Sequence, residues 1–177
     1  MSALPERFAF LAEEPGPRML REALPLLGTV ETPGKGNNPT IMAWAAEVGL
    51  KEAYSEDSIP WCGLFMALLA KRADKPIVKG PLWALNWLNF GVSVPRPSLG
   101  DVIVVQREGG GHVTLYVAED EKNYYGLGGN QSDMVSIAPI AKNRKPWFRR
   151  PKYINQPANV RPIILGGSLT QPTGKES

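Results

Sequence analysis

The sequence is poor in cysteine and histidine: its 177 residues include one of each, Cys62 and His112. A single cysteine excludes an internal disulfide, so the fold does not depend on an oxidising compartment. Zinc sites usually combine several Cys and His ligands, and one of each is too few. The sequence therefore predicts no metal site. It also lacks the P-loop and dinucleotide-binding motifs that would indicate a cofactor.

Long apolar segments are also lacking. The longest apolar run lies near residues 64–70 and ends at Lys71 and Arg72, so no segment predicts a membrane span. The first residues do not show a basic stretch followed by an apolar core, which is the pattern of a secretory signal. We therefore expect the chain to be synthesised in the cytoplasm.

Acidic residues are absent from residues 134–175, which carry eight Lys and Arg. This stretch has a charge of +8 in a chain of net charge +3, so the remainder carries −5. The basic residues are either solvated charges on a last strand and tail or a surface that attracts an anionic polymer. With 43% apolar and 21% charged residues, we expect one domain over residues 1–150. Residues 151–177 are expected to form a basic tail, rich in Pro and Gly, whose last ten residues are disordered.

Cys62 stands where a helix is expected to begin. It follows Pro60-Trp61 and opens the apolar segment 62–72. The positive end of a helix dipole stabilises a thiolate, which is the reactive form of cysteine. Taken alone, an isolated cysteine beside Trp and Leu is more often a small buried hydrophobic residue.

His112 stands where a strand is expected to begin, after the glycines at 109–111. An imidazole brought close to Cys62 would take the thiol proton and later return it to a leaving group. A neutral imidazole that acts through one nitrogen needs an acceptor for its other N–H. Asn130 is the candidate acceptor. Gln131 is its rival, because successive strand residues face opposite ways and only one of the two can point at His112.

Turn residues divide the chain into helices followed by strands. Helices are expected over residues 17–28, 41–48 and 81–90, and from Cys62 onward. Pro25 limits the first of these. In the segment 81–90, the side chains of Trp83, Trp87 and Phe90 predict core packing. Strands are expected at 102–106, 112–118, 123–128 and 134–138, with room for a return strand at 147–150. This order implies an α+β domain in which N-terminal helices pack on an antiparallel sheet.

Several of these segments together resemble the CHAP group of cysteine peptidoglycan hydrolases, which belongs with the NlpC-type hydrolases. The residues that carry the resemblance are Pro60-Trp61-Cys62, the segment 100–104, Gly111-His112-Val113 and the segment 128–133. The loop 31–41 also resembles the loop that precedes the catalytic helix in phage-type members. The resemblance covers roughly residues 20–150 and implies a papain-like (NlpC/CHAP-type) core.

By this resemblance, Cys62 is the nucleophile, His112 the base and Asn130 the residue that orients His112. Many relatives have Asp, Glu or His in the third place. We further expect Trp61, Gln131 and Asp57 to contact the substrate.

The implied function is hydrolysis of an amide bond in the peptidoglycan stem peptide through a thioester, as in an N-acetylmuramoyl-L-alanine amidase or an endopeptidase. The protein would be an endolysin-like or secreted antibacterial monomer that acts in the periplasm or outside the cell and does not bind nucleic acid. A delivery system would carry it there, and an immunity protein is a further expected partner. Two alternatives remain: an amidohydrolase of the same fold acting on a protein or another amide, and a non-catalytic basic module that binds wall polymer or nucleic acid.

Overall fold

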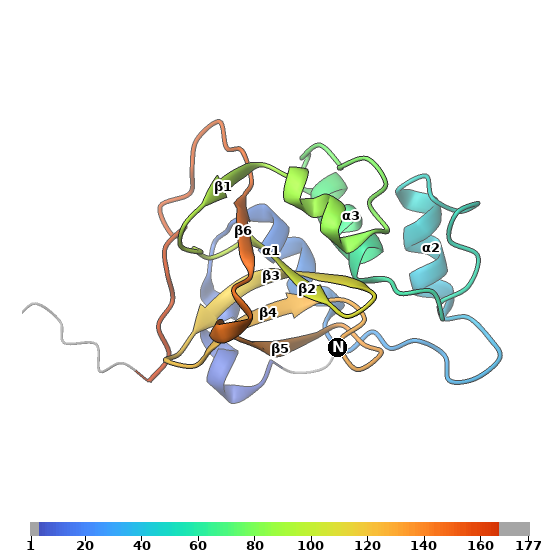
Figure 1. Cartoon of the computed structure of the whole chain (residues 1–177), viewed down its shortest axis with the longest axis horizontal. Helices are drawn as coiled ribbons and strands as arrows, with labels where there is room; N and C mark the ends of the chain where they lie inside the picture. The colour runs from blue at the N-terminus through green and yellow to red at the C-terminus, as the bar shows by residue number, and fades with distance from the viewer. Residues whose placement is uncertain (1–3, 167–177) are drawn as a thin grey trace, which may run out of the picture.

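The centre of the molecule is an antiparallel sheet. In the computed structural model, which describes residues 4–166, six strands pair in the order β1-β6-β2-β3-β4-β5 (Figure 1). The strands are β1 (Val92–Val94), β2 (Val102–Arg107), β3 (Gly110–Glu119), β4 (Asn123–Gly128), β5 (Ser136–Ala141) and β6 (Trp147–Arg150). The expected strands are confirmed, except that β5 begins two residues later and β1 was not anticipated. Met134 instead forms an isolated bridge with Val30.

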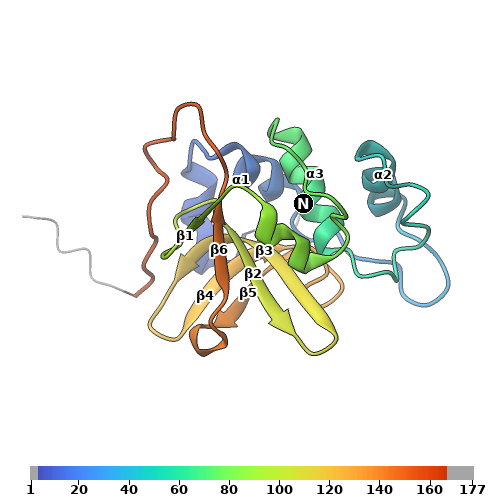
Figure 2. The same ribbon diagram turned by 45° about the horizontal axis from the view of Figure 1, so that its top comes forward.

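Helices cover one face of this sheet. The α-helices are α1 (Arg18–Ala23), α2 (Pro39–Glu47) and α3 (Cys62–Arg72), and the 3-10 helices are η1 (Glu6–Glu13), η2 (Leu24–Leu26), η3 (Ala84–Asn89) and η4 (Lys142–Arg144). Figure 2 shows α1 and α3 above the strands, with α2 set to the side of α3. The α+β class is therefore confirmed, and a helix does begin at Cys62.

The segment 81–90 differs from expectation. It forms only the short 3-10 helix η3, and the indole N–H of Trp87 donates to the Pro81 carbonyl oxygen (2.9 Å). Trp87 and Phe90 are buried as expected, but Trp83 is 54% exposed. The prediction that all three aromatic side chains pack in the core is wrong for Trp83.

The sheet curls, so both of its faces are buried. Val102 and Val104 of β2 face the main core with α1 and α3, whereas Ile103 and Val105 belong to a second cluster. In that cluster the rings of Tyr124 on β4 and Phe148 on β6 meet edge to face at 4.9 Å, although β2 and β3 lie between these strands in the sheet. Because of this curvature, most residues of β3 are buried.

The chain after β6 packs against the domain. The N–H of Leu99 donates to the Arg161 carbonyl (2.9 Å), and the N–H of Glu119 donates to that of Ile163 (2.8 Å). These two hydrogen bonds join the segment around residues 161–163 to the domain. The last ten residues, expected to be disordered, lie outside the described residues.

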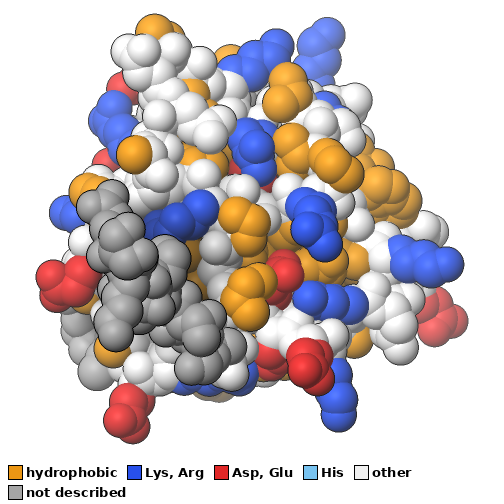
Figure 3. All heavy atoms as spheres, turned by 90° about the vertical axis from the view of Figure 1, so that its left-hand side faces the viewer, with side chains coloured by type: hydrophobic (Ala, Val, Ile, Leu, Met, Phe, Trp, Pro, Cys, Tyr) orange, Lys and Arg blue, Asp and Glu red, His pale blue; other side chains and the backbone are white. Residues whose placement is uncertain are grey.

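Three of the basic residues in the last third of the chain form ion pairs. Lys142 contacts Glu119 (3.3 Å), Arg150 contacts Asp101 (2.8 Å) and Arg161 contacts Glu14 (2.8 Å). Figure 3 shows Lys and Arg side chains interspersed with Asp and Glu on the face that carries the C-terminal segment. Within residues 4–166, carboxylates therefore pair with three of the eight positive charges. Of the helices within residues 4–166, none has the length and apolar character needed to cross a membrane.

Candidate active site

Cys62 is the first residue of α3 and is almost completely buried, with 5% of its surface exposed. The helix forms here because residues 62–70 are all apolar or glycine and are buried on every side. Its first turn leaves backbone N–H groups without helical partners. The N–H groups of Cys62 and Gly63 both lie close enough to hydrogen-bond the thiol. The helix start thus surrounds the sulfur with donors.

Gly63 allows a second segment to approach this helix start. A Cβ atom at residue 63 would lie 2.1 Å from the Pro81 carbonyl oxygen and 3.1 Å from the Leu82 backbone. The absence of a side chain therefore lets the Pro81–Leu82 backbone pass directly beside the start of α3 at Cys62.

Trp61 and Asp57 hold the loops that precede α3. Trp61 is fully buried, and its indole N–H donates to Glu31 (2.9 Å). The Asp57 carboxylate is 1% exposed and accepts hydrogen bonds from the N–H groups of Thr32 (2.9 Å) and Asn38 (2.7 Å). In this structure the polar atoms of both side chains are turned inward and join the 31–38 loop to the Cys62 loop, and their contact with a substrate stays a prediction.

His112 lies at the start of β3, 2% exposed, and its Nε2 atom is 2.8 Å from Oε1 of Gln131. The orientation of the Gln131 amide is fixed, because its Nε2 atom donates to the carbonyl oxygens of Gly126 (3.1 Å) and Ser136 (2.6 Å). Its Oε1 atom must then accept, so the proton of a neutral His112 ring resides on Nε2. Nδ1 is left unprotonated and free to act as a base.

The side chain that contacts the His112 ring is therefore that of Gln131, the alternative to Asn130. Asn130 has a φ of +56°, in the left-handed region that Asn tolerates better than most residues. Ser132 and Asp133 also have positive φ values, of +54° and +60°. The backbone thus turns sharply on both sides of Gln131 and directs its side chain back under the sheet. Sequence alternation alone left the two residues as rivals.

Two glycines give this turn the space it needs. A Cβ atom on Gly128 would lie 2.5 Å from Thr114 Oγ1 and 3.0 Å from Gln131 Oε1, and one on Gly129 would lie 2.7 Å from Phe65 of α3. Gly128 therefore admits the Gln131 amide, and Gly129 lets the turn pack against the Cys62 helix. The Thr114 hydroxyl beside the amide is buried, and within the described part of the chain it has no hydrogen-bond partner.

The Cys62 thiol meets the His112 strand at Val113. The backbone N–H of Val113, the residue directly after His112, lies near enough to the sulfur to lower the pKa of the Cys62 thiol. The structure thus places the Cys62 sulfur beside the start of β3, and it joins the His112 ring at that start to Gln131 from the turn after β4.

Burial keeps this group neutral at rest. Desolvation raises the pKa of the Cys62 thiol, and the surrounding N–H donors and Arg107 only partly offset this effect. Desolvation also lowers the pKa of His112 to about 4, despite the hydrogen bond to Gln131, and the positive charges of Arg107 and Arg144 lower it further. The resting pair is therefore a thiol and a neutral imidazole. Reaction then requires the proton to move as the sulfur attacks.

A cleft of about 560 Å³ opens onto Cys62. Its walls are Leu50 and Ile59 on one side, Leu82 and the exposed Trp83 on another, and the backbone of Gly109–Gly111 on a third. A Cβ atom on Gly110 would lie 3.8 Å from the Trp83 ring, so these two walls face each other closely. The cleft lining contains no charged side chain. The cleft suits an uncharged part of a ligand. The role of Trp83 as a wall could not be predicted from the sequence, because the nearby Trp87 and Phe90 are core residues.

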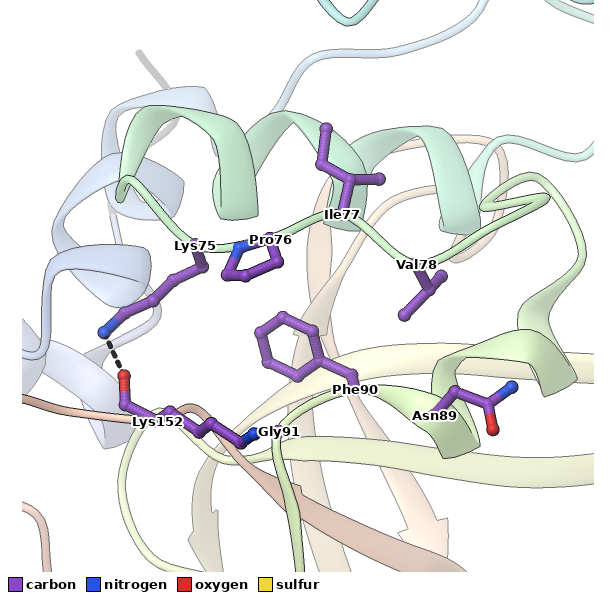
Figure 4. Close-up of a pocket in the computed structure, with 8 residues that line it drawn as sticks. All are labelled: Lys75, Pro76, Ile77, Val78, Asn89, Phe90, Gly91 and Lys152. Carbon is purple, nitrogen blue, oxygen red and sulfur yellow. Dashed lines mark hydrogen bonds between the residues drawn. The ribbon is translucent and has the colours of Figure 1, made fainter.

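A second pocket of about 210 Å³ lies between the segment after α3 and the segment before β1. Figure 4 shows Phe90 pointing into it, with Lys75 donating to the Lys152 carbonyl oxygen across one end. Cys62 and His112 are not among its lining residues. Within residues 4–166, no three Cys, His, Asp or Glu side chains are grouped so as to hold a metal ion.

No family model matches this sequence, and a search of curated proteins likewise finds no match. The chemistry of the site therefore has to be inferred from the residues themselves.

Proposed function

We propose that the protein is a cysteine hydrolase with a papain-like (NlpC/CHAP-type) core that cleaves an amide bond of the peptidoglycan stem peptide. The observation that carries the proposal is the arrangement of three residues: a cysteine at a helix start beside the N–H of Val113, a histidine directly before Val113 with Nδ1 unprotonated, and an amide that fixes that histidine. Hydrolysis by a cysteine needs a nucleophile, a base and a group that orients the base, and these three residues can supply them.

In the first half of the reaction, Nδ1 of His112 takes the Cys62 thiol proton while the sulfur attacks the substrate carbonyl carbon. The oxyanion that forms is stabilised by backbone N–H groups at the start of α3, which are already directed toward the thiol. His112 then gives its proton to the leaving amine, the C–N bond breaks, and a thioester to Cys62 remains.

In the second half, a water molecule enters from the cleft and His112 removes one of its protons. The resulting hydroxide attacks the thioester carbonyl, the C–S bond breaks, and the sulfur regains a proton from His112. The products are a carboxylic acid and an amine, and the enzyme returns to its neutral resting state.

Peptidoglycan is proposed as the substrate because of the resemblance carried by the motifs around Cys62, His112 and Gln131. Two of the motifs lie around the same site. The 31–38 loop supports the turn before Cys62, and the 128–133 turn supplies the Gln131 amide. Their convergence supports treating the motifs as parts of one family pattern.

The test is digestion of purified peptidoglycan by the wild-type protein and by Cys62→Ala and His112→Ala variants, with fragments identified by mass spectrometry. Lys122→Gln, an exposed change in the turn between β3 and β4, is the matched control. We expect fragments with a new amino terminus or a freed lactoyl group from wild type and Lys122→Gln only. Equal release by folded Cys62→Ala would refute the proposal. No release by any protein would mean that the substrate is a different amide.

A further inference from the structure

Two arginines lie at the end of β2, beside the start of β3. The strand register pairs Arg107 with Gly110, Gln106 with Gly111 and Val105 with His112. Arg107 is therefore two residue pairs away from the candidate base, opposite a glycine that forms the cleft wall.

Arg144 reaches the same place from η4. Its Nη2 atom donates to the Gln106 carbonyl oxygen (2.8 Å), which fixes the guanidinium over the end of β2. Both arginine side chains are exposed. They come from segments 37 residues apart in the sequence, and only the fold brings them together at the His112 end of the cleft.

Neither arginine has a carboxylate partner. Within residues 4–166, five arginines form ion pairs and five do not; Arg107 and Arg144 belong to the second group, with Arg21, Arg96 and Arg149. Glu108, in the same hairpin turn, also makes no ion pair there and is exposed. The positive charge of both arginines nevertheless acts on His112, and that of Arg107 acts on Cys62, so both charges lie within electrostatic reach of the reacting groups.

We propose that Arg107 and Arg144 form a carboxylate-binding subsite, which holds an acidic group of the substrate on the His112 side while the apolar cleft holds an uncharged part. Guanidinium groups bind carboxylates through paired hydrogen bonds, and two unpaired guanidiniums beside an uncharged cleft leave the substrate to supply the negative charge. This inference rests on the proposed function. It specifies a substrate with a free carboxylate close to the scissile amide, as in the γ-linked glutamate of a stem peptide.

The test measures binding and not turnover, so that its outcome is independent of whether peptidoglycan is cut. The Cys62→Ala protein is titrated by calorimetry with the tripeptide L-alanyl-γ-D-glutamyl-L-lysine, and separately with the same tripeptide in which the glutamate α-carboxylate is an amide. We expect the acid to bind at least about tenfold more tightly than the amide.

Arg107→Gln and Arg144→Gln, each introduced into Cys62→Ala, should weaken binding of the acid about tenfold and leave binding of the amide unchanged. Lys122→Gln removes a positive charge near the opposite end of β3 and should change neither. Equal affinity for acid and amide, no binding of the acid, or no effect of the arginine changes would each overturn the subsite. If the subsite is confirmed while wild type releases no fragments from peptidoglycan, the proposed function fails and the subsite stands.

Discussion

At the scale of single residues, Gln131 determines which ring nitrogen of neutral His112 carries the proton. Its amide group is held at both ends, so it accepts the Nε2 proton of His112 and leaves Nδ1 as the basic nitrogen. A neutral amide stabilises an imidazolium less than a carboxylate does, because it brings no opposite charge. This agrees with the low pKa of about 4 for buried His112. The structure thus favours a thiol at Cys62 and a neutral imidazole at His112 over a thiolate–imidazolium pair.

Loss of the Gln131 amide should reduce turnover without removing it. In Gln131→Ala the ring of His112 loses its acceptor, so we expect kcat to fall about 10- to 100-fold, less than for loss of His112 itself. The pH profile should also change, because the tautomer is no longer fixed. Steady-state assays on soluble wall fragments measure this, and a wild-type kcat in a folded Gln131→Ala protein would show that the amide has no orienting role.

Asn130 should behave as a backbone residue. Asn130→Gly is expected to keep full activity, since glycine adopts the φ of +56° without strain, whereas Asn130→Ala should lose about 1 kcal/mol of folding stability. Activity assays combined with urea unfolding separate these effects. A large loss of kcat in a stable Asn130→Gly protein would instead assign a chemical role to the side chain.

Burial of neutral His112 makes stability depend on pH. In the unfolded chain the histidine has its ordinary pKa of 6.5 and gains a proton below that pH. In the folded protein the pKa of His112 is about 4, so the ring stays neutral down to that pH. Between these values the unfolded state binds more protons, so folding stability must fall as the pH falls. From about pH 7 to pH 5 we expect a loss of about 2 kcal/mol, measured by urea unfolding. In His112→Gln this loss should be largely absent. A wild-type stability that does not change over this range would contradict the burial of the neutral ring.

At the scale of elements, the start of α3 is where four segments converge. The 81–82 backbone, the 128–133 turn and the start of β3 all contact its first residues, and the 31–38 loop supports the loop before it. The helix places Cys62, and the neighbouring segments determine what surrounds the sulfur.

Gly63→Ala tests this close packing. Alanine favours helices more than glycine does, by about 1 kcal/mol, but its Cβ atom would lie 2.1 Å from the Pro81 carbonyl oxygen. Displacement of the Pro81 backbone should cost about 1–3 kcal/mol and reduce activity by distorting the cleft. Gly110→Ala is the matched control, because its Cβ atom meets only the Trp83 ring at 3.8 Å. Greater thermal stability with full activity in Gly63→Ala would contradict this packing.

Regular periodicity made most elements predictable. Alternating residues located β2, β3 and β4, and the apolar run after Pro60-Trp61 located α3. The segment 81–90 was less well predicted, because its aromatic residues suggest a helix while the Trp87 indole is bonded to the Pro81 carbonyl in a tighter 3-10 turn.

Cys62 and His112 could be singled out from the sequence, whereas the contacts of the residues around them could not. Cys62 and His112 stand out because each is the only residue of its type. The choice between Asn130 and Gln131 depends on three positive φ values in one turn, which alternation in a strand does not reveal. Trp61 and Asp57 are close to Cys62 in sequence, but their side chains turn inward to partners in the 31–38 loop.

At the scale of the whole molecule, ion pairs join distant parts of the chain. Asp101, at the start of β2, is completely buried and accepts two hydrogen bonds from Arg150 of β6 (3.0 and 2.8 Å). Glu14 is similarly joined to Arg161 near the other end of the chain. Arg150 and Arg161 thus join distant parts of the chain, whereas Arg107 and Arg144 form no ion pair within residues 4–166.

Removal of one member of the buried pair should be costly. Arg150→Met leaves the Asp101 carboxyl buried without a cation, and we expect the free energy of unfolding to fall by about 3 kcal/mol. Chemical denaturation measures the change. Arg18→Met, in an exposed pair with Asp74, is the control and should cost less than about 1 kcal/mol. Equal effects of the two changes would mean that the Asp101 pair does not stabilise the sheet.

The formation of a thioester on Cys62 is tested most directly by mass spectrometry of the intact protein, quenched with acid while it digests soluble wall fragments. We expect an added mass equal to the acyl part of the substrate, mapped to the peptide that contains Cys62 and absent from Cys62→Ala. Fragment release by folded Cys62→Ala at the wild-type rate, with no added mass on either protein, would contradict the role of Cys62 as the nucleophile.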